Sequence, residues 1–461
     1  MRRFFCTLIL SALSCAIYAQ TTAETALVDY INNGDNNYKW ESIDQMQGEG
    51  VTAYRLELTS QKWQDIVWRH ELVVIIPNVV EHDEALLHIS GGSVDTETNK
   101  PNMHGWNDGT IKKQADIARR CKAVTAILWQ VPRQPLYGNK YEDDLLSYTL
   151  YRFMTSKDYS WPLLFPMVKS AVKAMDAIEE FVSEKKSTTV NKFVLNGYSK
   201  RGWTTWMTAG SGDKRVVAIA PAVIDILNMQ SNVPYQRHMF GDYSASIGDY
   251  VNIGLTEQLI TPEGWEVVRM VDPYSYRKNY NMPKMVLLGS NDPYWATDAV
   301  KNYIDDIPGK SWTAYSVNAG HGLNEEATST LEAFFYQSIN GMKYPKMDYK
   351  VAESADGITM QFKADKELLE GVEIWEAVSE NKDFRKCEFK PTKIDGVAHS
   401  KRFKVGVDYP QSGYKAFVVI LKYRHPSKPN ATYNITTRMY TADSDELFDE
   451  AFVSTLQSPE K

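Results

Sequence analysis

A serine, an aspartate and a histidine follow one another along this chain in an order and on segments that suit nucleophilic catalysis. Ser199 stands in Gly-Tyr-Ser-Lys-Arg-Gly, directly after the apolar run Phe193–Leu195. Asp292 directly follows the strand-like run Lys284–Gly289, and His321 follows a later one. A serine hydroxyl is a weak nucleophile at neutral pH and needs a base that an acid orients. The pattern therefore predicts Ser199 as nucleophile, His321 as base and Asp292 as acid.

The residues around Ser199 predict a strand, a tight turn and a helix, the layout of a nucleophile elbow. The free N–H groups at the start of such a helix stabilise negative charge that develops on a substrate oxygen. In the usual G-x-S-x-G pattern a glycine stands two places after the serine, but here that place holds Arg201, and the glycine is Gly202. A bulky residue at this place must point away from the crowded turn.

Two backbone segments are candidates for an oxyanion hole. The first donor would be the N–H of Lys200, and the second would come from the Gly91-Gly92 loop, where glycines let the backbone approach a substrate. The side chains of Lys200 and Arg201 either favour anionic groups of a substrate or form salt bridges to structural carboxylates.

Five further residues are candidates for a role near these three. Asp298 lies six positions after Asp292 and could be the acid instead. Asp225 follows the strand after the nucleophile strand, where it could support the site. Glu142 and Asp143 would bind a substrate ammonium, or would form a helix cap or a structural ion pair. Trp295 is a candidate substrate contact.

The surrounding elements predict an α/β fold with a mainly parallel sheet, because strand-like and helix-like runs alternate. The strongest helix pattern is Leu163–Lys185, whose apolar residues recur every three or four positions. The expected strands are Val51–Leu58, Glu71–Ile76, Ala85–Ile89, Ala123–Gln130, Phe193–Leu195, Val216–Pro221, Lys284–Gly289 and Trp312–Val317, with another helix over Ile111–Arg120. We expect an α/β-hydrolase fold over residues 24–343, with helices on both faces of the sheet.

Two later segments differ from this alternation. Residues 227–270 are rich in Tyr, Asn and Gly and predict either a cap over the site or packing at the sheet edge. Residues 345–442 contain short strands separated by turn residues, which predicts a separate small immunoglobulin-like β-sandwich. Such a domain would offer a surface for protein or glycan contacts. Residues 443–461 form an acidic tail.

The first 19 residues are typical of a secretory signal peptide, with two arginines, a short apolar run and small residues up to Ala19. The alternative is lipid attachment at Cys15. The apolar run is too short for a stable membrane span. We expect a secreted or periplasmic protein. Cys121 and Cys387 would then remain, either as one disulfide or as two buried thiols.

Composition limits the function classes. The 461 residues carry a net charge of −7 and show no basic stripe, which argues against nucleic-acid binding. The histidines show no metal-ligand spacing such as H-E-x-x-H, and no C-x-x-C pair occurs. We therefore expect no metal and no organic cofactor.

Several stretches resemble the PhoPQ-activated pathogenicity-related family of α/β-hydrolase-like proteins. They are Gln130–Leu136, Pro166–Ala171, Gly197–Thr204, Pro221–Asp225, Asp272–Tyr276 and Met282–Lys284, together with Glu142-Asp143. In that family Ser-Lys-Arg-Gly replaces the usual elbow, so Arg201 fits the type. The resemblance implies the serine role for Ser199, the acid role for Asp292 and the base role for His321. The chain departs from the family at Asn291-Asp292-Pro293-Tyr294, where Gly-Asp-Glu-Phe is usual.

These patterns favour a secreted serine hydrolase that cleaves an ester or peptide bond through an acyl-enzyme. The acidic Glu142 and Asp143 and the aromatic residues of the cap favour a peptide substrate over a lipid. One alternative is a binding or signalling protein that keeps the fold without turnover, since fold does not imply function. Another is a carbohydrate esterase whose β domain binds glycan through exposed aromatics such as Trp375 or Tyr414.

Overall fold

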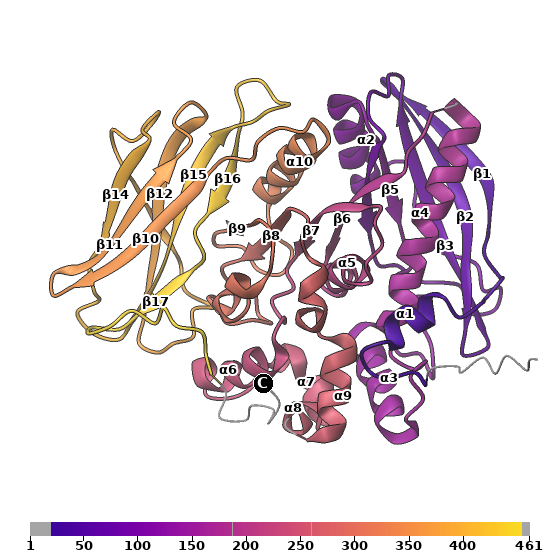
Figure 1. Ribbon diagram of the computed structural model, residues 1–461, viewed down its shortest axis with the longest axis horizontal. Helices are drawn as coiled ribbons and strands as arrows, with labels where there is room; N and C mark the ends of the chain where they lie inside the picture. The colour runs from indigo at the N-terminus through magenta and orange to yellow at the C-terminus, as the bar shows by residue number, and fades with distance from the viewer. Residues whose placement is uncertain (1–19, 187, 260, 454–461) are drawn as a thin grey trace, which may run out of the picture.

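The structure is a computed structural model that describes residues 20–186, 188–259 and 261–453 (Figure 1). The predicted signal peptide, the alternative lipid-attachment site at Cys15 and the end of the acidic tail lie outside these residues. Within the described ranges, no helix combines the length and the apolar character that crossing a membrane requires.

The N-terminal part is built on one twisted sheet in the order β1-β2-β3-β5-β4-β6-β7-β8-β9. Strands β1 to β3 pair antiparallel, β3 pairs antiparallel with β5, and β5, β4, β6, β7, β8 and β9 are parallel neighbours. The bounds are β1 Lys39–Gly48, β2 Val51–Trp63, β3 Ile66–Pro77, β4 Glu84–Ile89, β5 Val124–Leu128, β6 Lys192–Tyr198, β7 Val216–Ala222, β8 Lys284–Gly289 and β9 Ser311–Ser316.

Helices cover both faces of this sheet, because alternate residues of each central strand point to opposite sides. Phe193 and Leu195 of β6 pack in one apolar cluster with α1, α3, α4 and α5, whereas Val194 packs in another with α2 and α10. The helices are α1 Ala26–Ile31, α2 Gly109–Cys121, α3 Glu142–Ser156, α4 Leu164–Lys186, α5 Lys200–Gly210 and α10 Glu325–Ile339. This is an α/β-hydrolase-like fold, as the alternation of strands and helices predicts.

A helical insertion lies between β7 and β8. It comprises α6 Met229–Phe240, η1 Ala245–Ile247, α7 Gly248–Asn252, α8 Leu255–Gln258, α9 Pro262–Val271 and η2 Pro273–Asn279. Figure 1 shows α6 to α9 grouped with α3 beyond one end of the parallel strands. The described residues of this insertion contribute no strand to either sheet.

The C-terminal part is a β region of two sheets, β10-β11-β14 and β16-β15-β12-β13, with β17 paired to β15. The second sheet continues the N-terminal sheet, because Thr436 of β16 pairs with Thr313 of β9. Short turns separate most of these strands as expected, but the β region shares its main sheet with the α/β part. The bounds are β10 Met347–Ser354, β11 Gly357–Ala364, β12 Leu369–Ser379, β13 Lys390–Lys393, β14 Arg402–Val407, β15 Tyr414–Arg424, β16 Thr432–Thr436 and β17 Tyr440–Ala442.

Candidate active site

Ser199 lies on a sharp turn between β6 and α5, with φ 57° and ψ −124°. Such backbone geometry is uncommon for a residue other than glycine and often marks functional sites. Close packing maintains it: a Cβ on Gly197 would lie 2.5 Å from the carbonyl oxygen of Arg201, and one on Gly202 would lie 2.7 Å from that of Ala222. Gly202 therefore lets the helix pack closely against the end of β7, the role that a glycine has two places after the serine in the usual elbow.

The Arg201 side chain leaves the turn, as expected, but it is buried and ion-paired. Its guanidinium donates two hydrogen bonds to Glu142, at 2.8 and 2.6 Å, and one to the Val131 carbonyl at 2.5 Å. The same group packs so closely on Gly91 that a Cβ there would lie 2.5 Å from its Nη2. Arg201 thus fastens the elbow helix to α3 and to the loops after β4 and β5, and its charge is not free for a substrate.

Asp292 and His321 lie together at the carboxyl ends of β8 and β9. Nδ1 of His321 lies 2.8 Å from Oδ2 of Asp292, and Oδ1 of Asp292 accepts the N–H of Tyr294 at 2.9 Å. The Tyr294 ring stacks on the His321 ring, with centroids 4.4 Å apart. The other ring nitrogen of His321 is buried and has no hydrogen-bond partner among the described residues. This ring is oriented by a carboxylate and keeps one nitrogen available for a proton.

Ser199 follows β6, two strands from β8, so the carboxyl edge of the parallel sheet brings all three predicted catalytic residues to one end of the molecule. Ser199 and Tyr294 line the same pocket, and Tyr294 is the residue that stacks on His321. Within the described residues no hydrogen bond joins Ser199 to His321. Catalytic hydrogen bonds often tighten only when substrate binds.

The other two candidate acids lie elsewhere. Asp298 is fully buried and bonds to Lys301, Tyr235 and Thr441, at 2.9, 2.9 and 2.7 Å from its Oδ2. The Asp292 carboxylate, not that of Asp298, contacts His321. Asp225 is also buried and does not line the pocket, although its neighbours Ile224 and Ile226 do. Burial raises the pKa of Asp225 to about 7.

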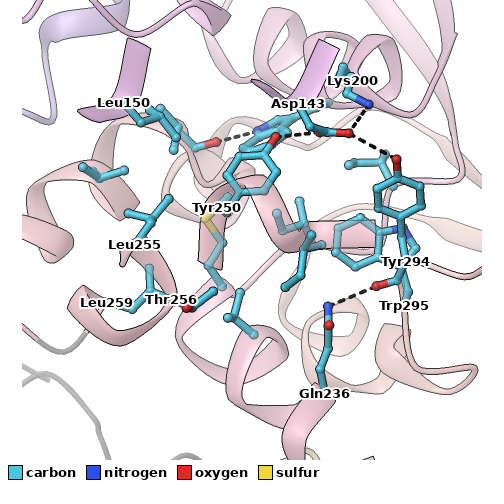
Figure 2. A pocket seen from close by; sticks show the side chains of 18 of the residues that line it. Asp143, Leu150, Lys200, Gln236, Tyr250, Leu255, Thr256, Leu259, Tyr294 and Trp295 are labelled. Atoms are coloured by element: carbon cyan, nitrogen blue, oxygen red, sulfur yellow. Dashed lines mark hydrogen bonds and ion pairs between the residues drawn. The ribbon is translucent and has the colours of Figure 1, made fainter. Parts of the chain in front are cut away.

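Glu142 and Asp143 begin α3 and are engaged by protein cations. Oδ2 of Asp143 lies 2.6 Å from Nζ of Lys200, and the hydroxyls of Tyr250 and Tyr294 donate to Asp143 at 2.8 and 3.1 Å (Figure 2). Glu142 forms the ion pair with Arg201 described above. The pairing of both carboxylates with Lys200 and Arg201 is the structural alternative that the sequence left open.

Glu142 offers a test of this cluster. Burial alone would raise the pKa of its carboxyl, but the charge and hydrogen bonds of Arg201, the hydrogen bond from Gln134 and the charge of Lys200 together outweigh burial and lower the pKa to about 2. A depressed pKa adds stability above the ordinary value of 4.5, and this stability is lost as the pH falls through about 2. Glu142→Gln should therefore unfold at a lower temperature than the wild type at pH 7, and the difference should shrink between about pH 4.5 and 2.

Thermal unfolding midpoints between pH 7 and pH 2 would check this. Glu325→Gln is a matched control, because Glu325 forms an exposed pair with Lys113 at 2.7 Å and such pairs add little stability. An equal midpoint for Glu142→Gln and the wild type at pH 7 would show that the pair does not hold the elbow.

The predicted oxyanion donors lie at neighbouring strand ends, since Ile89 of β4 pairs with Gly197 of β6. The carbonyls of Gly91 and Gly92 accept hydrogen bonds from Gln130 and Gln134, at 2.8 and 3.1 Å. Within the described part of the chain, the amides of Gly91, Gly92 and Lys200 donate to no protein atom.

A pocket opens beside Ser199 and is lined mainly by the helical insertion (Figure 2). It holds about 700 Å³ not filled by protein atoms, counting space open to solvent. Trp295, the candidate substrate contact, lines this pocket, and its indole N–H is buried with no partner among the described residues.

A loop of the C-terminal β region contacts the loops that hold Asp292 and His321, which sequence patterns did not reveal. In this 380–389 loop, between β12 and β13, the carbonyls of Phe384, Arg385 and Cys387 accept hydrogen bonds from the Asn291 side chain at 3.2, 3.3 and 2.7 Å. The Asn318 side chain exchanges two hydrogen bonds with the Phe389 backbone, at 2.9 and 2.8 Å. Asn291 precedes Asp292, and Asn318 lies in the loop that carries His321.

Both cysteines in the described residues are free thiols, Cys121 buried and Cys387 partly exposed. Of the two alternatives, a disulfide or two free thiols, the structure has two free thiols. The described residues contain no group of three or more His, Cys, Asp or Glu side chains arranged to hold a metal ion.

Known proteins resemble this chain at two levels. Acetyl xylan esterase 1 from Thermoanaerobacterium sp. JW/SL YS485 is 13% identical, with a TM-score of 0.44 over 68% of this chain and 92% of the esterase. An acetyl xylan esterase from Paenibacillus sp. R4 is 10% identical, with a TM-score of 0.47 over 68% of this chain and 92% of that protein.

The sequence comparisons cover more of the chain than these structural matches do. Autocrine proliferation repressor protein A from Dictyostelium discoideum is 30% identical over 451 residues, which cover 90% of this chain and 88% of that protein. The family described as PhoPQ-activated pathogenicity-related protein matches residues 27–385, a span that contains the elbow, the acid loop and the histidine loop. The chain therefore belongs to the PhoPQ-activated pathogenicity-related family.

Proposed function

We propose that the protein is a serine hydrolase that cleaves an ester or peptide bond, with Ser199, His321 and Asp292 as its catalytic triad. The observation that carries this proposal is the His321 ring, which is held by Asp292 at 2.8 Å and stacks on Tyr294, a residue of the Ser199 pocket. Its second nitrogen is buried and has no hydrogen-bond partner among the described residues. A buried ring nitrogen with no protein partner is in the state that a general base needs.

The reaction would proceed in two balanced steps. His321 takes the hydroxyl proton of Ser199 while Oγ bonds to the acyl carbon, and the bond to the leaving oxygen or nitrogen breaks as His321 returns the proton to it. Water then repeats the sequence, bonding to the acyl carbon and releasing Ser199. We assign the stabilisation of the negative oxygen formed in each step to the amides of Lys200 and of the Gly91-Gly92 loop, which donate to no protein atom among the described residues.

Labelling with a fluorophosphonate tests the proposal. These reagents bond to an activated serine, so the intact mass should rise by one adduct in the wild type and by none in Ser199→Ala. A Ser211→Ala variant is a matched control, because Ser211 at the end of α5 is bonded to a helix carbonyl and should not affect labelling. An unlabelled wild-type protein that is folded by circular dichroism would contradict the proposal.

A second candidate is a signalling protein that acts without turnover. The relative named autocrine proliferation repressor protein A supports it, since the likeness extends over 90% of the chain and includes the β region. A carbohydrate esterase receives less support from the β region, because Trp375 and Tyr414 are only partly exposed and pack against the core. Labelling separates the first two, because a protein without turnover has no need of an activated serine.

A further inference from the structure

We propose that the pocket beside Ser199 binds an uncharged, apolar acyl group of the substrate. This inference rests on the proposed hydrolase function and adds the chemical class on which it acts. It also departs from the expectation that acidic residues would select a substrate with a free ammonium group.

The walls of the pocket are almost entirely aliphatic and aromatic. The apolar lining residues are Leu150, Trp203, Ile224, Ile226, Met229, Val233, Ile247, Leu255, Leu259, Val267, Val271 and Trp295. Most of these come from the insertion between β7 and β8 or from the loop that leads into it. An apolar group that leaves water for such a surface gains free energy in proportion to the area it buries.

Most polar groups in the lining are already used by the protein. The Trp203 indole donates to the Val271 carbonyl at 2.6 Å. The Gln236 side chain donates to the Tyr294 carbonyl at 3.0 Å and accepts the Ser244 amide at 3.0 Å. Because these groups are satisfied, they offer little to a polar substrate. The Trp295 indole N–H and the Thr256 hydroxyl are the exceptions, since neither has a hydrogen-bond partner among the described residues.

Asp143 is the one carboxylate among the described residues that line the pocket, and its charge is neutralised. Asp143 holds Lys200 at 2.6 Å and accepts two tyrosine hydroxyls, as Figure 2 shows. A substrate ammonium would have to displace Lys200, whose side chain is only 8% exposed. Displacing it would break the shorter of its two ion pairs and leave this buried cation with only Glu142, at 3.6 Å, which already pairs with Arg201. Breaking a buried ion pair is costly. The charge arrangement therefore disfavours a cationic substrate and leaves apolar contact as the main source of selectivity.

The first experiment measures kcat/KM for p-nitrophenyl acetate, butanoate, hexanoate and octanoate. Each methylene added between acetate and hexanoate should be buried in the pocket. The value of kcat/KM should therefore rise about four-fold per methylene. A flat or falling series for an enzyme whose Ser199 labels with fluorophosphonate would overturn this inference and leave the proposed function intact. If Ser199 does not label and no ester is hydrolysed, both are wrong.

The second experiment compares p-nitrophenyl esters of leucine and of 4-methylpentanoate, which differ by one ammonium group. Each rate is divided by the spontaneous rate of the same ester, because the ammonium activates the ester on its own. The uncharged ester should be favoured at least ten-fold. Equal rates, or preference for the leucyl ester, would overturn the inference.

A matched pair of variants locates the effect in the pocket. Val267 and Val268 are adjacent in α9 and both are buried, but only Val267 lines the pocket. Val267→Ala should enlarge the pocket and raise the octanoate to hexanoate ratio of kcat/KM several-fold, whereas Val268→Ala should leave that ratio unchanged. The same ratio in all three proteins would show that the acyl group binds elsewhere.

Discussion

Asp292→Asn should lower the rate of the proposed reaction by about 10⁴-fold, the loss known for removal of a triad acid. Asp292 accepts a hydrogen bond from Nδ1 of His321, and an asparagine that presents its NH₂ group there would force the proton to the other ring nitrogen. That nitrogen could then no longer take the proton of Ser199. The measurement is the rate constant of fluorophosphonate labelling, which requires no knowledge of the natural substrate.

Asp298→Asn is the control for this experiment, because Asp298 is the alternative acid in the sequence. Its carboxylate bonds to Lys301, Tyr235 and Thr441, so the variant should lose stability, by about 3–5 kcal/mol for a broken buried pair. Labelling per folded molecule should stay within a few-fold of the wild type. A large loss in Asp298→Asn with a normal Asp292→Asn would assign the acid role to Asp298.

The second large effect should come from Asn318→Gly, which cuts the link between the histidine loop and the 380–389 loop. Asn318 has a positive φ of 57°, so glycine removes the side chain without straining the backbone. Loss of its two hydrogen bonds to Phe389 frees the segment that carries His321. Displacement of a catalytic group by about 1 Å can cost 10²-fold, so kcat should fall about 10- to 100-fold with little change in KM.

Asn430→Gly is a matched control, since Asn430 also has a positive φ, of 59°, and lies exposed in the β region away from the catalytic loops. Steady-state kinetics on p-nitrophenyl hexanoate would give kcat and KM for both variants. If both variants matched the wild type, the 380–389 loop would have no role in positioning His321.

The turn at Ser199 and the positions of Asp292 and His321 after their strands could be predicted because their signals are local. The run before Ser199 is apolar, glycines stand at Gly197 and Gly202, and Asp292 and His321 each follow a strand. Parallel strands bring such loops to one edge whatever the details between them. The order of these residues along the chain was therefore enough to predict that they lie at the same edge of the sheet. The hydrogen-bond partner of each side chain became known only from the structure.

Contacts between distant segments could not be predicted. Arg201 finds Glu142 59 positions earlier, and Asn291 bonds to Cys387 96 positions later, yet neither pair leaves a pattern in the sequence. Helix α3 lacks a strong apolar stripe, and β1 is largely exposed and polar, so neither appears among the expected elements. Tertiary packing, not local preference, fixes both.

The order of these segments has a consequence for synthesis. Ser199, Asp292 and His321 all precede the β region, whereas the loop that holds Asn291 and Asn318 comes from that region, and β16 must arrive before the shared sheet is complete. A nascent chain that has released only its α/β part would contain every reacting group and still lack the support for two of them. On the proposed mechanism, we therefore expect activity to begin only after the C-terminal region has been made and has folded onto these two loops.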